Sequence, residues 1–218
     1  MPQVASERDG LDRVTVRLVA AEELGRLNHH LQEGHYLASR RLAGRALRYV
    51  AELDGQWGAL LTFSASALHL KAREQWIGWT PRQRARWLGL VVNNSRFLVR
   101  PPRQRYPNLA SQVLGLALRR LSADWQAHWG HPVLVVERFV DGARYRGTCY
   151  RACGFAAVGP TVGFGRPRGP MARAAGARGA GAIGRGWQGA ARQRTRADSL
   201  NSWCAQQTFT TVWPLLNR

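Results

Sequence analysis

Two carboxylates stand four residues apart beside an apolar run, a spacing that suits acid–base or metal chemistry. Glu137 follows the sequence VLVV, and Asp141 lies four residues further along the chain. Side chains alternate between the two faces of a strand, so an even spacing places both carboxylates on one face. Such a pair can act as a catalytic base or bind a divalent cation. The alternative is structural ion pairing with three nearby arginines, Arg138, Arg144 and Arg146.

Four polar residues interrupt another apolar segment of the chain. Between LGLVV and FLV stand Asn93, Asn94, Ser95 and Arg96. A buried strand tolerates polar side chains only when their hydrogen bonds are satisfied. Amide and guanidinium groups bond well to nucleobases and phosphates, so we predict that this run, Asn94 and Arg96 above all, contacts a ligand. The alternative is a polar turn at the end of a strand.

Two basic loops carry further candidate ligand contacts. Arg40 and Arg41 lie in the first loop, and Arg103 and Arg105 lie in the second, between prolines. Arginine forms paired hydrogen bonds to phosphate oxygens, so these four residues are candidates for binding nucleic acid. His35 begins the first loop and titrates near neutral pH, which makes it a candidate catalytic base. The alternative for a lone histidine in a loop is an exposed surface position.

Between these loops, tryptophans alternate with arginines over residues 73–87. The set consists of Trp76, Trp79, Trp87, Arg73, Arg82, Arg84 and Arg86. Indole rings stack on bases while arginines bind phosphates, so this segment could contact nucleic acid. The alternative is that Trp76 and Trp79 belong to the core, because large aromatic side chains are mostly buried.

The overall charge favours a polyanionic partner. The chain has 32 Lys+Arg against 13 Asp+Glu, a formal net charge of +19. Such a charge attracts polyanions, and nucleic acid, DNA in particular, is the partner that we predict. A basic, solvated surface without a dedicated ligand is the alternative.

The cysteines and the apolar runs favour a cytoplasmic protein with no membrane partner. The three cysteines, Cys149, Cys153 and Cys204, form no spaced metal-binding pattern. Their odd number, in a sequence without an apolar secretion signal, is typical of reduced thiols in the cytoplasm. The longest apolar runs are far too short to span a bilayer. We therefore predict neither a cysteine-bound metal nor a membrane anchor.

The elements that must position these residues alternate between helix and strand. Leucines at helical spacing predict a helix over residues 20–31, and two strands at 47–53 and 57–63 flank the hairpin turn Asp54-Gly55. The remaining predicted elements are a short helix from Thr80-Pro81, strands at 88–92 and 97–99, a helix at 109–121, a strand at 133–140, a helix at 143–153 and a strand from 155. This order predicts an α/β (α+β) domain with one mixed sheet and helices on both faces.

A change in composition divides the chain near residue 165. We assign residues 1–20 to a lead-in, 21–165 to the folded domain and 166–218 to a basic tail. Residues 163–189 contain nine glycines and no acid. Such a segment buries too little apolar surface to offset the entropy of ordering it, so we predict disorder. A nucleic-acid-binding arm and out-of-frame translation are two explanations of the tail.

The predicted element order resembles the acyl-CoA N-acyltransferase (GNAT) fold. In that family, a loop with the pattern Arg/Gln-x-x-Gly-x-Gly/Ala holds the cofactor pyrophosphate through backbone amides at a helix N-terminus. The matching stretch here is Arg105-Tyr106-Pro107-Asn108-Leu109-Ala110. The resemblance implies acyl-CoA as a cofactor, held at Asn108, Leu109, Ala110 and Ser111. This sequence departs from the pattern, because Asn108 replaces the glycine and Pro107 lacks an amide donor.

A second similarity to the GNAT fold lies further along the chain. The stretch Tyr150-Arg151-Ala152-Cys153-Gly154-Phe155 resembles the family's Tyr-x-x-x-Gly-Phe. The resemblance implies that Tyr150 protonates the departing thiolate, that the loop of His35 shapes the acceptor site and that the strand of Asn94 faces the substrate cleft. The alternative for Tyr150 is a structural role, with a packed ring and a hydrogen-bonded hydroxyl.

Four longer stretches resemble the DruA family, named for a component of the Druantia anti-phage system. They are GHYLASRRLAGRALRYVAELDG, WIGWTPRQRARWLGLVVNNSRFLV, PNLASQVLGLALRRLSADWQ and ERFVDGARYRGTCYRACGF. The resemblance spans about residues 28–165 and implies a role in defence, or in DNA mobility beside transposases. It also implies a helicase or a transposase encoded nearby as a partner.

These observations predict a DNA-associated protein of a bacterial defence system or mobile element that binds nucleic acid through arginines. The alternative is an acyl-CoA-dependent N-acyltransferase acting on an amine. A third hypothesis is metal-dependent processing of DNA strands with Glu137 and Asp141 as ligands.

Overall fold

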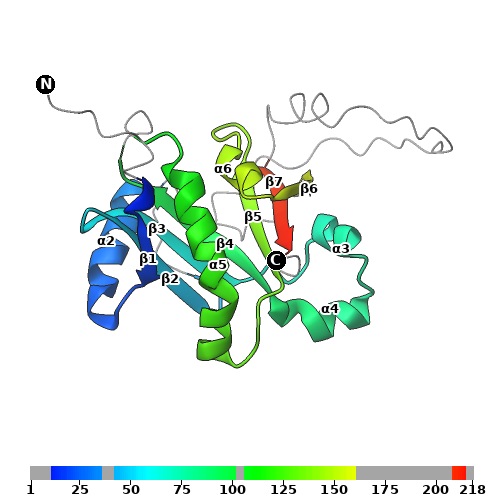
Figure 1. The fold of residues 1–218 in the computed structure, drawn as a ribbon. Coiled ribbons are helices and arrows are strands. Elements are labelled where there is room, and N and C mark those ends of the chain that lie inside the picture. Colours follow the sequence, from blue (N-terminus) through cyan, green and yellow to red (C-terminus); the bar gives the residue numbers. More distant parts are fainter. Residues whose placement is uncertain (1–10, 36–41, 102–105, 161–207, 215–218) are drawn as a thin grey trace, which may run out of the picture.

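One mixed sheet forms the centre of the protein. The computed structural model describes residues 11–35, 42–101, 106–160 and 208–214. Its strands are β1 (Thr15–Leu18), β2 (Ala46–Leu53), β3 (Gln56–Ala65), β4 (Val91–Val99), β5 (Val135–Asp141), β6 (Ala156–Pro160) and β7 (Thr208–Pro214). They lie in the order β1-β2-β3-β4-β5-β7-β6, with β4 and β5 parallel and the other pairs antiparallel (Figure 1). The predicted fold class is confirmed.

The hairpin of β2 and β3 forms where the sequence predicts it. Asp54 and Gly55 make the turn with φ angles of 52° and 71°. Aspartate and glycine both tolerate positive φ, which hairpin turns of this length require. β1 pairs with β2 at the sheet edge, so residues 15–18 belong to the sheet and not to the predicted lead-in. Four residues carry too little periodicity to reveal such a strand in the sequence.

Helices cover both faces of the sheet, as predicted. On one face, α5 (Leu109–Trp129) packs against Tyr49 within the larger core cluster. On the other face, α2 (Leu24–Gly34) packs Leu27 against Val50. Tyr49 and Val50 face opposite layers because side chains alternate along a strand. Figure 1 shows α5 crossing in front of the sheet.

Two predicted helix boundaries differ from the structure. α5 continues past Leu121 and ends at Gly130, whose φ of 77° gives the left-handed conformation common at helix C-termini. α6 (Thr148–Ala152) is shorter than the predicted 143–153, because residues 142–144 form a turn directly after β5. Among the described residues, no helix has the length and apolarity needed to cross a membrane.

Residues 208–214 correct the predicted tail. We predict disorder for residues 166–218, but residues 208–214 form β7, which lies between β5 and β6. The register pairs Val136 of β5 with Trp213 and Ala156 of β6 with Val212. The sequence does not reveal β7, because the strands that pair with it, β5 and β6, lie far away along the chain. The rest of the tail lies outside the described residues.

The connection between β3 and β4 holds two short helices. α4 (Pro81–Trp87) begins at the predicted position: Thr80 Oγ1 accepts a hydrogen bond from the Gln83 amide (3.3 Å), and Gln83 Oε1 accepts one from the Thr80 amide (2.9 Å). α3 (Lys71–Ile77) has no counterpart among the predicted elements. Leu88–Leu90, predicted as strand, is a 3-10 turn that leads into β4.

Candidate ligand site in the wedge between β4 and β5

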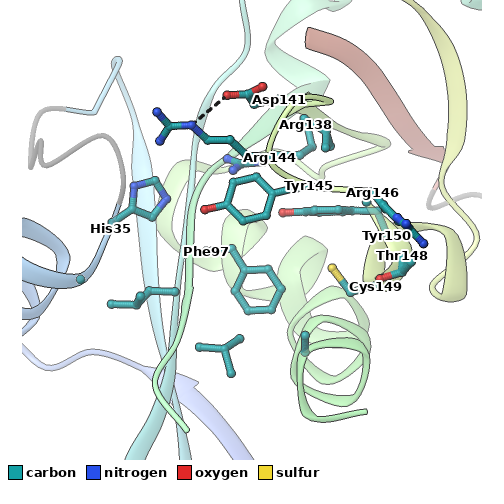
Figure 2. A pocket seen from close by; sticks show the side chains of 16 residues that line it. His35, Phe97, Arg138, Asp141, Arg144, Tyr145, Arg146, Thr148, Cys149 and Tyr150 are labelled. Carbon is teal, nitrogen blue, oxygen red and sulfur yellow. Dashed lines mark ion pairs between the residues drawn. The ribbon is translucent and has the colours of Figure 1, made fainter. Parts of the chain in front are cut away.

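A cavity of about 630 Å³ opens where the two parallel strands part (Figure 2). The parallel ladder pairs residues 91–93 of β4 with residues 135–137 of β5 and then ends. Further along, Phe97 and Val99 of β4 and Val140 of β5 line the cavity. We call this space the wedge. Its walls are largely apolar, and its polar groups come from the end of α2, from β5 and from the turn before α6.

The wedge is rich in cationic side chains. Arg138, Arg144 and Arg146 line it together with one carboxylate, Asp141. Asp141 Oδ2 lies 3.5 Å from Arg144 Nε, so this carboxylate balances one of the three guanidinium groups. The remaining positive charge, held in a concave site with low-dielectric walls, favours an anionic ligand.

Arg138 is buried without a carboxylate partner among the described residues. Its exposed fraction is 8%, and its Nη1 donates to the carbonyl O of Asn94 at 2.6 Å. Its Cζ lies 6.0 Å from the centroid of the Tyr150 ring. A buried charge is normally paired, because removing it from water is costly. An anionic group bound in the wedge would supply the missing counter-charge.

The polar run of β4 forms a β-bulge, not the predicted interruption of the strand. Thr62 of β3 pairs with Arg96 while Phe63 pairs with Asn94, so Ser95 is the extra residue. A bulge leaves backbone groups without ladder partners. Asn94 Nδ2 satisfies two of them, donating to the carbonyl O of Thr62 (3.2 Å) and of Arg96 (3.3 Å).

The other polar residues of this run also serve the bulge. Ser95 Oγ hydrogen bonds with Ser64 Oγ and donates to the carbonyl O of Asn93 at 3.1 Å. Arg96 Nη1 donates to the carbonyl O of Ser95 at 2.7 Å. None of the four residues of the run lines the wedge. Asn94, Ser95 and Arg96 therefore make hydrogen bonds within the bulge and with the neighbouring strand, and a ligand contact at residues 93–96 stays a prediction.

Tyr150 joins this network to the wedge. Its hydroxyl donates to Asn94 Oδ1 at 2.7 Å, and its ring packs edge-on against Phe97 and Phe155. The residue is 5% exposed, and Figure 2 shows it among the side chains that line the wedge. Tyr150 therefore lines a cavity, as the GNAT resemblance implies, and its ring is also packed and its hydroxyl hydrogen-bonded, as the structural alternative requires.

His35 lies at the mouth of the wedge and is buried, which excludes the exposed surface position. It follows α2, and its amide donates to the carbonyl O of Leu31 at 3.2 Å. Burial above all, together with the charges of Arg138 and Arg96, lowers the pKa of His35 to about 4. The imidazole is therefore neutral at pH 7, and the lowered pKa makes it a weaker base than an ordinary histidine.

Glu137 and Asp141 do not form a joint site. Glu137 lies inside the protein, where its Oε2 accepts from Arg73 Nη1 (2.8 Å) and its Oε1 accepts from the Ala67 amide (2.9 Å). Asp141 lies at the wedge. Four residues of strand separate the two by roughly 13 Å, too far for one metal ion. The described residues contain no group of three metal-ligating side chains. Both carboxylates form ion pairs instead, as the structural alternative predicts. Asp141 pairs with Arg144, whereas Glu137 pairs with Arg73, which is not one of the arginines near it in the sequence.

The predicted cofactor residues divide between two cavities. Ala110 lines the wedge, whereas Asn108 and Ser111 line a separate cavity of about 340 Å³ beside α5. Leu109 is buried in the core, and its amide donates to the carbonyl O of Tyr106 at 3.2 Å. The first turn of α5 therefore offers fewer backbone donors toward the wedge than the GNAT pattern implies.

Four of the predicted nucleic-acid contacts lie outside the described residues. Arg40, Arg41, Arg103 and Arg105 fall in the segments that the structure leaves undescribed. The sequence suggests only a structural role for Arg138, Arg144 and Arg146, as ion-pair partners of the carboxylates. In the structure, these three arginines supply the cationic lining of the wedge. The alternation of basic residues in RFVDGARYR, directly after an apolar strand, was the available signal.

Comparisons with known proteins agree on family and fold. The family described as "Druantia protein DruA" matches residues 8–180, so the similarity continues past residue 166. No curated protein matches the sequence.

Among solved structures, the aminoglycoside acetyltransferase AAC(6')-Ib is similar in fold. Its complex with coenzyme A has a TM-score of 0.50 at 14% identity, covering 92% of this chain and 94% of that chain. Its complex with paromomycin and acetyl-CoA has a TM-score of 0.51 at 14% identity, covering 93% and 94%. At this identity, the similarity establishes the GNAT-like fold and not the activity.

Proposed function

Because the chain belongs to the DruA family, we propose that it is a DNA-associated component of an anti-phage defence system or mobile element, and that the wedge holds an anionic part of its ligand. The single observation that carries this proposal is the buried guanidinium of Arg138, which has no carboxylate partner among the described residues. Arg146 adds an exposed cation at the same cavity. Phosphate is the anion that nucleic acid presents to such a group.

The distribution of ion pairs supports the same proposal. Some arginines elsewhere on the described surface are paired with carboxylates: Arg17 lies 2.6 Å from both Glu23 and Glu52, and Arg120 lies 2.7 Å from Asp124. In the wedge, one carboxylate faces three arginines. An excess of cationic side chains in a concave site raises the local concentration of an anion.

Replacing the two exposed arginines of the wedge, Arg144→Gln with Arg146→Gln, should weaken DNA binding by about tenfold and lower the salt slope by about two phosphate contacts. The measurement is fluorescence anisotropy of labelled DNA across a salt series with the full chain. The matched control is Arg26→Gln with Arg119→Gln, which removes the same charge from exposed positions on α2 and α5. An equal loss of DNA affinity in both double variants would mean that the wedge has no specific role and that only the total charge matters. A DNA affinity that does not change with salt would overturn the proposal.

A second candidate function is N-acyl transfer, favoured by the placement of Tyr150 in a wedge between diverging parallel strands. Acyl-CoA would supply the activated acyl group. Neutral His35 could accept a proton from an amine, and the Tyr150 hydroxyl could give a proton to a departing thiolate, provided that it exchanges its hydrogen bond to Asn94 Oδ1. Against this candidate stand Pro107, which has no amide proton, and the Leu109 amide, which is already bonded.

Isothermal calorimetry with acetyl-CoA separates the two candidates. If the wedge takes the cofactor, binding heat and a rise in Tm are expected, and both should diminish when Arg138→Met removes the buried cation. Tyr150→Phe should then retain binding and lose transfer to a test amine. Absence of heat and of any Tm shift with acetyl-CoA and with longer acyl-CoA thioesters would exclude acyl transfer.

A further inference from the structure

We propose that the connection between β3 and β4 is a second nucleic-acid contact, a stacking surface for single-stranded segments. We call it the α3–α4 corner and define it by Lys71, Trp76, Arg82, Arg86 and Trp87. Figure 1 shows α3 and α4 away from α2 and α5, near the edge of the sheet that holds β6 and β7. The inference rests on the proposed function, because it names the form of nucleic acid that the protein binds.

The length of this connection has no topological cause. β3 and β4 are antiparallel neighbours, and two residues suffice to join such strands. The chain instead uses residues 66–90 and builds two helices from them. Connections between sheet strands run over the protein surface and carry binding residues disproportionately often.

The corner is held rigidly despite the shortness of its helices. Arg73 of α3 is fully buried and donates to Glu137 Oε2 on β5 (2.8 Å) and to the carbonyl O of Ala67 (2.9 Å). Arg84 of α4 donates to Glu74 Oε2 of α3 at 3.2 Å, which ties the two helices together. These contacts anchor both helices to each other and to the sheet, so the backbone that carries the exposed side chains is held in place.

Two indole rings are exposed on this rigid support. Trp76 and Trp87 keep exposed fractions of 43% and 39%, and the Arg86 guanidinium lies 4.8 Å above the centroid of the Trp87 ring. Among the described residues, these are the exposed tryptophans. Large aromatic side chains usually contribute to the core, so their exposure at one corner indicates a binding surface.

The charge of the corner selects the partner. Lys71, Arg82 and Arg86 are exposed. Within residues 66–90, all of which the structure describes, Glu74 is the one acid, and it is bonded to Arg84 and to the Leu70 amide. Cations beside open aromatic faces complement single-stranded nucleic acid, in which phosphates bind the cations and unpaired bases stack on the rings. A duplex offers the phosphates but hides the faces of its bases.

The test uses the full chain and labelled oligo(dT) of 20 nucleotides, with a duplex of the same length as the second probe. Trp76→Ala with Trp87→Ala should weaken single-strand binding by about tenfold or more and duplex binding by less than about threefold. Trp76→Tyr with Trp87→Tyr keeps aromatic faces and should recover most of the single-strand affinity. Circular dichroism and Tm confirm that the variants fold.

The outcomes separate this inference from the proposed function. If the unaltered chain binds neither probe, both fall. If it binds DNA and the alanine variant binds oligo(dT) as tightly as the unaltered chain, the inference falls and the proposed function stands. Equal losses for both probes would overturn the single-strand claim. Tryptophan-dependent binding to vesicles of anionic lipid, without binding to oligo(dT), would overturn it in favour of a membrane surface.

Discussion

Replacing Arg73 with methionine should lower the free energy of unfolding by about 3–5 kcal/mol. Arg73 and Glu137 are both fully buried, and their side chains lie 2.8 Å apart. Removing one partner leaves the other charge in an apolar environment, which costs more than the pair contributes when intact. Burial already raises the pKa of Glu137, and Arg73 is the group that opposes this shift most strongly. We expect the largest stability effect of any single substitution here.

Urea denaturation of the variant at pH 7 and pH 5 measures this loss. Without Arg73, the pKa of folded Glu137 rises further above its unfolded value, so the folded state gains stability from protonation at lower pH. The deficit of Arg73→Met should therefore shrink from pH 7 to pH 5. Adding Glu137→Gln removes the stranded charge and should recover more than half of the loss. Arg82→Gln on exposed α4 is the control and should stay within about 0.5 kcal/mol; a comparable loss there would contradict the prediction.

Replacing Asn94 with leucine should cost roughly 3 kcal/mol, because three buried or half-buried hydrogen-bonding groups lose this partner at once. The Asn94 side chain donates to the carbonyl O of Thr62 and of Arg96 and accepts from the Tyr150 hydroxyl. The two carbonyls belong to residues that pair across the β-bulge. The substitution should therefore loosen the sheet at the point where β4 and β5 part.

A double-variant cycle with Tyr150→Phe tests whether the two residues act together. If the hydroxyl of Tyr150 depends on Asn94, the double variant should lose less stability than the sum of the single losses, by about 1 kcal/mol. Asn93→Ala is the control, since Asn93 neighbours Asn94 in sequence but is half-buried. Strict additivity of Asn94→Leu and Tyr150→Phe would show that Asn94 does not position Tyr150.

Much of the fold follows from local signals in the sequence. The Asp54-Gly55 turn, the Thr80-Pro81 helix start and the leucine spacing of α2 all act through residues close in sequence, so pattern alone places them. The parallel strand at β5 is evident from its unbroken apolar run. α3 and β1 escape prediction because neither carries a clear period over enough residues.

The candidate site divides differently. The sequence identified Tyr150, His35 and Asp141, and the structure places all three at one cavity. It also pointed to residues 93–96, of which Asn94, Ser95 and Arg96 form hydrogen bonds within the bulge. A polar run inside an apolar strand shows that hydrogen bonds are needed, but not whether a ligand or the neighbouring strand supplies them.

By itself, the sequence determined the positive charge, the family, the alternation of helices and strands and the turns between them. Each depends on composition or on contacts within a few residues. Only the tertiary structure decided that Glu137 pairs with Arg73 and that β7 lies between β5 and β6. It also decided that Arg138 is buried and has no carboxylate partner among the described residues. Ion pairing depends on packing between segments that are distant along the chain. Several carboxylates of the same chemistry are available to each arginine, and only the fold determines which of them lies close enough to pair.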